Sequence, residues 1–423
     1  MSVEKESLSD LNDSKLAVKF IWIFIPFALS FFMSVLLRTV NNVLAPTFID
    51  TFHMNASQLG IMTSAYFISF AVAQIPLGVC LDKWGPGKSL GCFMLFGVVG
   101  CIVFGVAPNV TFLFIGRALV GFGVSGCLMS SYKAIGDWKD KESVPMYNGF
   151  ISFFGGVGGI FATKPVSAAN DFIGWRALFF VFAGMMLLVA VLVFFTKNHP
   201  KYSEYSDSSI AHELKGTLQL AITPRFWRFA PTAVVTQATY VALNSLWIGP
   251  WLRDVGHYSP NSVTNLLLLC SVSITIGYIS GGSISSWLKR KFRINVISTF
   301  QCTMWVFTAI TACIALFPSF GAPLWVAFLL ICPFCLTAYP IFTSMFDPAV
   351  AGRVQTLFNM VMFIVSTVFQ SGIGMIIDRY PAVADGGFNP AGYKVSLLIL
   401  AAINAAALLW YTFYRRKENE VTY

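Results

Sequence analysis

Long apolar stretches, separated by mostly short polar connections, follow one another along almost the whole chain. An apolar run of about 18 residues or more is typical of a helix that crosses a membrane. The pattern predicts twelve such spans, at roughly residues 20–45, 58–81, 89–106, 111–132, 146–168, 177–196, 227–251, 263–285, 294–317, 323–345, 354–377 and 394–414.

One longer polar connection, residues 197–225, divides these spans into two groups of six. We therefore expect an all-α membrane protein with twelve transmembrane helices in two six-helix bundles, residues 1–196 and residues 226–423. The first apolar run is too long for the core of a cleaved signal peptide, so we expect it to remain as the first span.

Composition and charge agree with this prediction and add an orientation. Of the 423 residues, 56% are hydrophobic and 11% are charged, whereas a soluble protein has about 25% charged residues. With a cytoplasmic N-terminus, the inside segments hold 21 Lys and Arg residues and the outside segments hold 4. Since positive residues collect in cytoplasmic loops, both termini and the 197–225 loop are predicted to be cytoplasmic. The net charge of +9 is spread over these short loops, so no nucleic-acid partner is expected.

Three basic residues lie inside predicted spans, namely Arg38, Arg117 and Lys164, whereas every Asp and Glu lies in a loop, in a tail or at a span end. A charge at mid-membrane costs about 3 kcal/mol or more, so it is usually retained for a function. The absence of a neutralising carboxylate indicates an anionic ligand. For Arg38 and Lys164 the alternative is a side chain that extends to the membrane surface. For Arg117 it is a structural anchor satisfied by backbone carbonyls.

Other polar residues inside the spans are candidates for the same ligand cavity. Asn41 and Asn42 follow Arg38 by three and four residues and so share its helix face. The further candidates are Tyr66, Gln74, Gln237, Tyr240, Asn244, Asn359 and Gln370. The alternative for each of them is a hydrogen bond between helices.

The loop after the second span reads Gly78-Val-Cys-Leu-Asp82-Lys83-Trp-Gly85-Pro-Gly87-Lys88. It resembles the G-x-x-x-D-[R/K]-x-G-x-[R/K] loop of the major facilitator superfamily. This resemblance implies a cytoplasmic gating loop made by Gly78, Asp82, Lys83, Gly85 and Lys88, in which Asp82 pairs with a cation or caps a helix. A weaker echo in the second half has Ser286 where Asp82 would fall.

The fourth span carries Arg117-Ala-Leu-Val-Gly121-Phe-Gly123, which resembles the R-x-x-x-G-x-G helix of the same superfamily. The first-span arginine, followed by an Asn-containing turn and Ala-Pro, resembles the organophosphate antiporters and the anion:cation symporters. The resemblance implies that Arg38 binds the substrate anion. It also implies that Arg117 either joins Arg38 in binding the anion or acts as a gate. The proton-coupled sugar-acid members carry carboxylates at the positions of Leu37 and Val124, which puts carboxylate-mediated proton symport in doubt here.

We therefore expect a secondary transporter, not an enzyme, that moves a small organic anion by alternating access. In the superfamily fold that the resemblance implies, spans 5 and 8 meet across the two bundles, as do spans 2 and 11. The glycines of the fourth, fifth, eighth and eleventh spans are therefore expected to form mainly this sliding interface, where small residues allow close packing. We expect a monomer in contact with membrane lipid, in the cell membrane and most simply the bacterial inner membrane, without cofactor or metal. The alternatives are a multidrug or siderophore exporter of the same superfamily and a transporter-like sensor.

Overall fold

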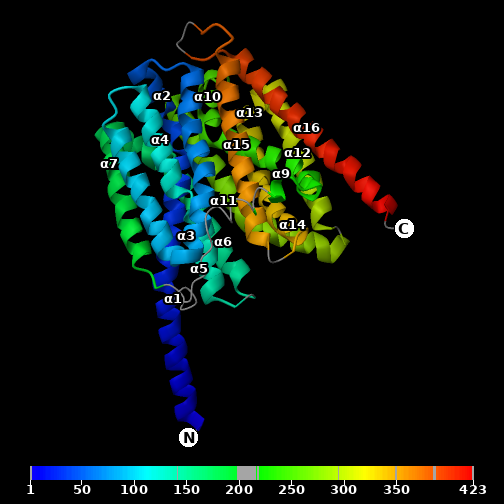
Figure 1. The fold of residues 1–423 in the computed structure, drawn as a ribbon. Coiled ribbons are helices and arrows are strands. Elements are labelled where there is room, and N and C mark those ends of the chain that lie inside the picture. Colours follow the sequence, from blue (N-terminus) through cyan, green and yellow to red (C-terminus); the bar gives the residue numbers. More distant parts are fainter. Residues whose placement is uncertain are drawn as a thin grey trace.

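The computed structural model describes residues 2–140, 142–197, 216, 219–293, 295–347, 350–383 and 387–421. These residues form helices and no strand (Figure 1). We call α1 to α7 the N-terminal half. Its helices are α1 (Ser2–Thr39), α2 (Asn41–Phe52), α3 (Ala56–Gly105), α4 (Val110–Val124), α5 (Cys127–Trp138), α6 (Val144–Phe161) and α7 (Lys164–Phe194).

We call the helices from α9 onward the C-terminal half. They are α9 (Pro224–Ala242), the π-helix η2 (Leu243–Trp247), α10 (Ile248–Asp254), α11 (Pro260–Phe292), α12 (Val296–Leu316), the 3₁₀-helix η3 (Pro318–Phe320), α13 (Gly321–Ile331), the 3₁₀-helix η4 (Cys332–Thr337), α14 (Ala338–Ser344), α15 (Ala351–Ile377) and α16 (Pro390–Val421). Most of the predicted loop 197–225 lies outside the described residues.

Nine helical segments among the described residues are long and apolar enough to cross a membrane. The predicted number is twelve, and the difference has physical reasons. α3 has 50 residues and would be about 75 Å long if straight, more than twice the thickness of a bilayer core. It bends at Gly85, whose φ of 75° favours glycine, so one element contains two predicted spans. The predicted span 227–251 is divided among α9, η2 and α10, and the predicted span 146–168 is divided between α6 and α7.

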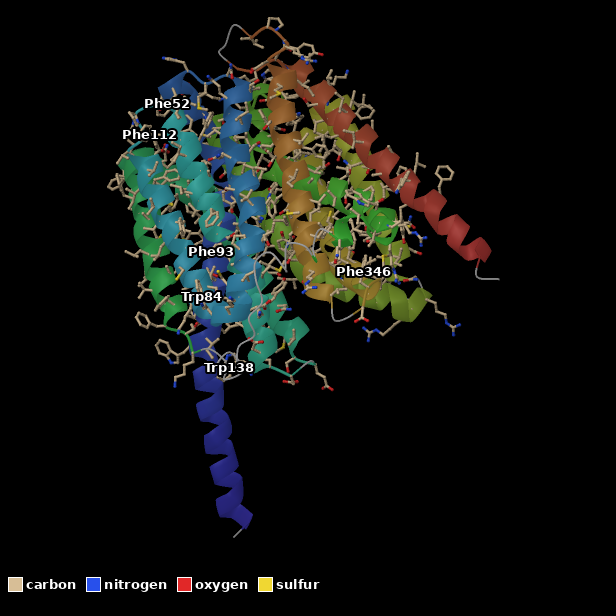
Figure 2. All side chains as sticks on the ribbon, viewed as in Figure 1. Phe52, Trp84, Phe93, Phe112, Trp138 and Phe346 are labelled. Carbon is tan, nitrogen blue, oxygen red and sulfur yellow. The ribbon has the colours of Figure 1, made fainter. Side chains whose placement is uncertain are left out.

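The outer surface of the helices is apolar. Large hydrophobic side chains such as Phe172, Phe195 and Trp22 are 90%, 77% and 72% exposed, and Figure 2 shows such side chains projecting outward around the helices. A surface of this kind is stable in contact with lipid and unfavourable in water. The described part of the chain therefore has the surface of a multi-pass membrane protein.

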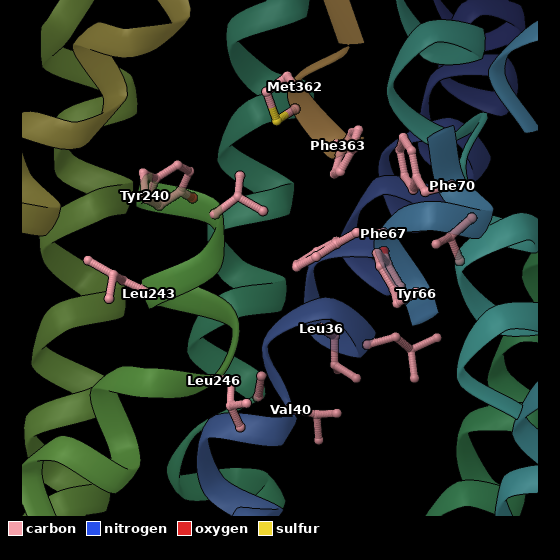
Figure 3. Packing of buried hydrophobic residues seen from close by; sticks show 14 of the residues in the cluster. Leu36, Val40, Tyr66, Phe67, Phe70, Tyr240, Leu243, Leu246, Met362 and Phe363 are labelled. Atoms are coloured by element: carbon pink, nitrogen blue, oxygen red, sulfur yellow. The ribbon is translucent and has the colours of Figure 1, made fainter. Parts of the chain in front are cut away.

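The two halves pack against each other through α3 on α15 and through α6 on α11, the pairs of spans that the superfamily resemblance implies. Gly374 of α15 lies against the Ala56 carbonyl, so that an added Cβ would overlap this oxygen. Deeper along the same helix pair, the rings of Phe70 and Phe363 face one another with centroids 4.1 Å apart (Figure 3).

Hydrogen bonds join the two halves at the end of the molecule where α3 begins. The Asp378 carboxylate, at the end of α15, accepts hydrogen bonds from the Ala56 and Ser57 amides at 3.0 and 2.7 Å. Asn42 donates to the Asn244 carbonyl and accepts from the Gly249 amide at 3.0 Å. We call this end the Asp378 end. Asp82 lies 26 residues farther along α3, or about 39 Å, so it marks the opposite end, the Asp82 end.

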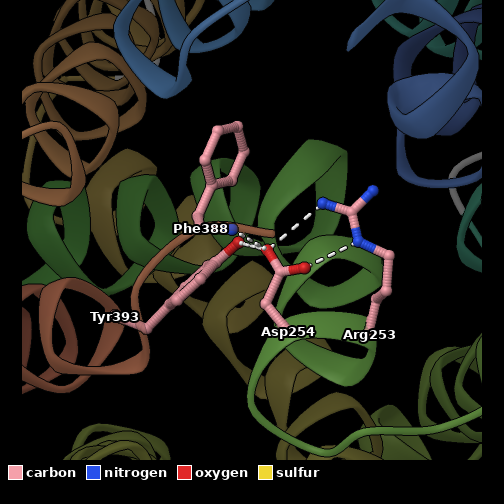
Figure 4. Close-up of polar contacts among 4 residues, drawn as sticks. All are labelled: Arg253, Asp254, Phe388 and Tyr393. Atoms are coloured by element: carbon pink, nitrogen blue, oxygen red, sulfur yellow. Dashed lines mark hydrogen bonds and ion pairs between the residues drawn. The ribbon is translucent and has the colours of Figure 1, made fainter. Parts of the chain in front are cut away.

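A second polar cluster holds the C-terminal half together at the Asp378 end (Figure 4). The buried Asp254 carboxylate accepts hydrogen bonds from the Arg253 guanidinium at 2.6 Å, the Tyr393 hydroxyl at 2.8 Å and the Phe388 amide at 3.2 Å. These bonds tie α10 to α16 and to the segment before it. The Asp378 end is therefore joined both within the C-terminal half and between the two halves.

Candidate functional site

A cavity of about 370 Å³ lies between the two halves. This volume is within the usual range for sites that bind small molecules. The N-terminal half lines it with Phe31, Ser34, Arg38, Phe70, Ser125, Leu128, Met129, Tyr132, Asn148 and Ser152. The C-terminal half lines it with Gln237, Tyr240, Val241, Tyr278, Leu336, Tyr339, Pro340, Gln355, Asn359, Met362 and Phe363.

Arg38 is the one charged side chain in this lining. It lies in the last turn of α1, just before a break at Val40 that separates α1 from α2. Within the described parts of the chain, no hydrogen bond or ion pair to its guanidinium is formed. Its electrostatic neighbours are the hydroxyls of four tyrosines, Tyr66, Tyr240, Tyr278 and Tyr339. The cavity therefore presents a guanidinium that is available to an anion.

The opposite wall is neutral, and several of its polar groups are hydrogen-bonded to one another, while Gln237 Oε1 is buried without a partner among the described residues. In one series of hydrogen bonds, the Asn244 amide donates to the Tyr240 hydroxyl at 3.5 Å, and this hydroxyl lies 3.1 Å from that of Tyr278. In a second series, Gln237 Nε2 lies 3.4 Å from the Tyr339 hydroxyl, which donates to Asn359 Oδ1.

The cavity continues toward the Asp82 end into a depression of about 510 Å³. Met129, Tyr132 and Gln355 line both spaces. Gly78 and Gln74 line the depression, and Gln74 Nε2 donates to the Ser125 carbonyl at 3.2 Å.

The Asp82 carboxylate forms an ion pair with Lys133 of α5 in this depression. Asp82 of this loop thus pairs with a cation of α5, and both partners belong to the N-terminal half. Gly85 forms the bend of α3, while Lys83 and Lys88 are exposed on either side of it.

Arg117 lies behind α1 and does not line the cavity. It is 1% exposed, and its Nη1 donates to the Leu37 carbonyl at 2.7 Å. Its guanidinium carbon is 5.2 Å from the ring centroid of Phe104 and 5.8 Å from that of Phe179. These contacts match the alternative in which this arginine is an anchor satisfied by a backbone carbonyl.

Lys164 is exposed at the start of α7, where its Nζ donates to Asn265 Oδ1 of α11 at 3.1 Å. It lies outside the cavity and joins the two halves.

Several other candidates also lie outside the cavity lining and bond to the protein itself. Asn41 donates to Thr63 at 2.8 Å, and the Tyr66 hydroxyl donates to the Ser34 carbonyl at 3.2 Å. Gln370 accepts from Ser245 at 3.2 Å, and Asn42 and Asn244 join the two halves as described above. The structure thus brings four of the candidates, Arg38, Gln237, Tyr240 and Asn359, into the main cavity.

The sequence reasoning missed Tyr278, Tyr339 and Asn148, which also line the cavity. A signal for Tyr339 was present, because it follows the 3₁₀-helix η4 and precedes Pro340 within an apolar span. Broken helices often form the sites of transporters, since their geometry turns polar groups inward. For Tyr278 and Asn148 the only signal was a polar group inside an apolar segment.

The chain matches the sequence model of the Major Facilitator Superfamily over residues 27–374. The chain belongs to this superfamily. The relatives described below are named as transporters. The family match and the apolar helical segments of the described residues are those of a multi-pass membrane protein.

Two bacterial relatives are named for organic anions. The chain is 28% identical over 277 residues to a probable sulfoacetate transporter, SauU, of Cupriavidus necator, which covers 62% of this chain and 64% of that protein. It is 21% identical over 402 residues to a probable L-galactonate transporter of Escherichia coli K12, which covers 90% and 86%. A third relative is the efflux pump aunC of Aspergillus niger, 26% identical over 194 residues, or 45% of this chain and 36% of the pump. The chain thus spans less than two thirds of the first relative and about a third of the fungal pump.

Solved structures of the superfamily have the same fold. A bacterial homolog of the human lysosomal transporter Spinster, in an inward-facing and unoccupied conformation, superimposes with a TM-score of 0.73 at 19% identity over 93% of this chain and 96% of that one. The nucleoside transporter NupG gives 0.69 at 15% identity over 92% and 98%. At these identities the likeness concerns the fold alone.

Proposed function

We propose that this superfamily member is a secondary transporter of a small organic anion, such as a sugar acid, a carboxylate or an organophosphate. The observation that carries the proposal is Arg38, which is the one charge in the cavity lining and has no partner among the described residues. A buried guanidinium without a counter-ion is unfavourable, and an anion in the cavity would relieve this by charge-assisted hydrogen bonds. The names of the sulfoacetate and galactonate relatives support the same class of substrate.

The proposed mechanism is alternating access of a twelve-helix protein in the cell membrane. The two bundles, residues 1–196 and 226–423, rock about the cavity, and both termini lie in the cytoplasm as the distribution of Lys and Arg predicts. In this topology the Asp82 end is cytoplasmic. The present structure, joined at the Asp378 end, then corresponds to a state open to the cytoplasm. We propose that the protein acts as a monomer.

Uptake into proteoliposomes tests the proposed substrate class. Purified protein is reconstituted, and entry of labelled L-galactonate and labelled sulfoacetate is compared with that of a neutral sugar. We expect saturable uptake of at least one anion, competition by other organic anions, and no uptake of the neutral sugar. Uptake of the neutral sugar alone would contradict the proposal.

The coupling follows from the absence of an acidic residue in the described cavity lining. A carrier whose empty cavity contains the positive charge of an arginine should change slowly between its two states. We therefore propose that the protein exchanges one anion for another or carries a proton with the substrate. Anion loaded on the far side of the vesicle should then accelerate uptake. Uptake that responds to a pH gradient but not to anion on the far side would contradict exchange.

The second candidate function is that of an exporter for apolar compounds. It is favoured by the apolar part of the lining, which includes Phe31, Phe70, Leu128 and Met362, and by the likeness to a fungal efflux pump. Exporters of cationic drugs usually have acidic cavity groups, and the charge here is of the opposite sign. Efflux of an apolar dye from the same vesicles, unaffected by organic anions, would favour this second function.

A further inference from the structure

Arg117 of α4 is a buried arginine that lies beside the residue preceding Arg38. Its Nη1 donates to the carbonyl of Leu37, the residue immediately before Arg38, at 2.7 Å. The guanidinium therefore contacts the backbone that carries the cavity cation. It does not reach the cavity itself.

The Leu37 carbonyl needs a donor because the helix ends there. α1 ends at Thr39, and the last four carbonyls of a helix have no amide of the following turn to accept from. The Val40 amide donates to the Leu36 carbonyl at 3.0 Å, whereas the Val43 and Leu44 amides donate to the carbonyl of Val40 and so begin the next helix. Arg117 thus supplies the donor for the carbonyl that follows Leu36, at the break between α1 and α2.

The position of Arg117 is itself fixed by packing. The rings of Phe104 and Phe179 lie within 6 Å of its guanidinium carbon, which favours a cation at this place. Two of its nitrogens, Nε and Nη2, are buried without a hydrogen-bond partner among the described residues. A side chain that is 1% exposed and held in this way cannot turn to meet a ligand in this state.

We infer that Arg117 is a positioning residue, which acts on the transported anion through the Leu37 carbonyl and thereby through Arg38. The inference rests on the proposed function. Because Arg117 does not reach the cavity, the described cavity lining contains a single positive charge, that of Arg38. The site therefore fits an anion with one negative charge. L-galactonate has one such charge, while sulfoacetate has two, a sulfonate and a carboxylate.

The kinetics of L-galactonate exchange in proteoliposomes test the positioning role. Arg117→Met keeps an unbranched side chain but removes every donor, and it should raise KM roughly tenfold while Vmax changes less than about twofold. Arg117→Lys keeps one donor for the Leu37 carbonyl, so its KM should stay within about threefold of the unaltered protein. A direct bidentate ligand would not tolerate lysine, because the ammonium is a point charge.

Arg176→Met is the matched control. Arg176 also donates to backbone carbonyls at a helix end, those of Gly105 and Ala107 at 3.2 and 2.8 Å. It lies away from Arg38, so its loss should lower thermal stability but leave the KM for L-galactonate unchanged. A rise in KM for Arg176→Met equal to that for Arg117→Met would overturn the inference, because any loss of such a bond would then have the same effect.

A double-mutant cycle separates this inference from the proposed function. If Arg117 acts through Arg38, Arg117→Met should change L-galactonate affinity less than about twofold once Arg38→Met is present. Additive losses, or tighter binding of sulfoacetate than of L-galactonate, would overturn the inference and leave the proposed function intact. Unchanged anion uptake in Arg38→Met would instead overturn the proposed function.

Discussion

The two halves of the molecule contribute different chemistry to the cavity. The N-terminal half brings Arg38, a cation with no partner among the described residues, whereas the C-terminal half brings hydroxyls and amides that already bond to one another through Tyr240, Tyr278 and Tyr339. The neutral wall needs no counter-ion, and its tyrosine hydroxyls are paired, while Gln237 Oε1 has no partner among the described residues. The charged wall has an unpaired guanidinium, which an anion would stabilise. The difference indicates that the N-terminal wall supplies most of the affinity and the C-terminal wall orients what is bound.

The halves also differ in how they use an acidic residue at a helix end. Asp378 of the C-terminal half reaches across to the amides of α3, while Asp82 of the N-terminal half pairs with Lys133 of its own half. The first contact joins the halves and must break when they separate at that end. The second can persist while the halves move as units. In the proposed mechanism, this asymmetry is expected of a state that is joined at the Asp378 end.

The largest effect is expected from removing the cation. Arg38→Ala should lower anion uptake on the order of 100-fold, because a charge-assisted, bidentate contact is lost. Arg38→Lys should fail to restore it, since the ammonium cannot form the same fork. Uptake of labelled anion into proteoliposomes, with protein content matched by immunoblot, provides the measurement. Near-normal uptake in Arg38→Ala would break the comparison, because the charged wall would then be dispensable.

A smaller effect is expected on the neutral wall. Tyr339→Phe removes the hydroxyl that links Gln237 to Asn359 and leaves both amides unpaired. KM for the anion should rise roughly three- to tenfold, as expected for one buried neutral hydrogen-bond link. The control is Tyr393→Phe, which loses a bond to Asp254 at the closed end and should affect stability without affecting KM. A larger loss from Tyr339→Phe than from Arg38→Ala would reverse the roles of the two walls.

The sequence predicted an all-helical member of the superfamily, and it did not predict the direction of the side chains. Apolar run length and the Asp82 loop were sufficient for a superfamily member, because both depend on local sequence. Arg38 and Arg117 have the same sequence signal, a cation in an apolar span, yet one faces the cavity and the other a carbonyl. That outcome depends on which helix packs behind each residue. The π-helix at Leu243–Trp247, within the predicted span 227–251, was not predicted from the sequence either.

The contact between halves at the Asp378 end gives a third prediction. Asp378→Asn keeps an acceptor for one α3 amide but removes the charge that interacts with the helix N-terminus. The population of the state joined at this end should fall about fivefold relative to its alternative. Distances between spin labels at Thr51 and Val383, in a cysteine-depleted background, report that population. Asp171→Asn, an exposed acid of α7, is the control and should leave the distances unchanged.

An unchanged distance distribution in Asp378→Asn would mean that other contacts between the halves, such as those of Asn42, hold this end. In that case Asn42→Ala, which removes the bonds to the Asn244 carbonyl and the Gly249 amide, should open it instead.

The smallest effect is expected from the pair within the N-terminal half. Asp82 and Lys133 have 44% and 26% of their side chains exposed, and exposed ion pairs contribute little to stability. Asp82→Asn should therefore leave the melting temperature nearly unchanged and slow turnover only about two- to fivefold, through the movement of the loop. Lys133→Met should slow it to the same extent if the pair is what matters. Counterflow rates for both variants are the measurement. Slow turnover in Asp82→Asn with normal turnover in Lys133→Met would show that Asp82 acts on another partner during the cycle. Asp82 and Asp378 would then be more alike than their contacts here indicate.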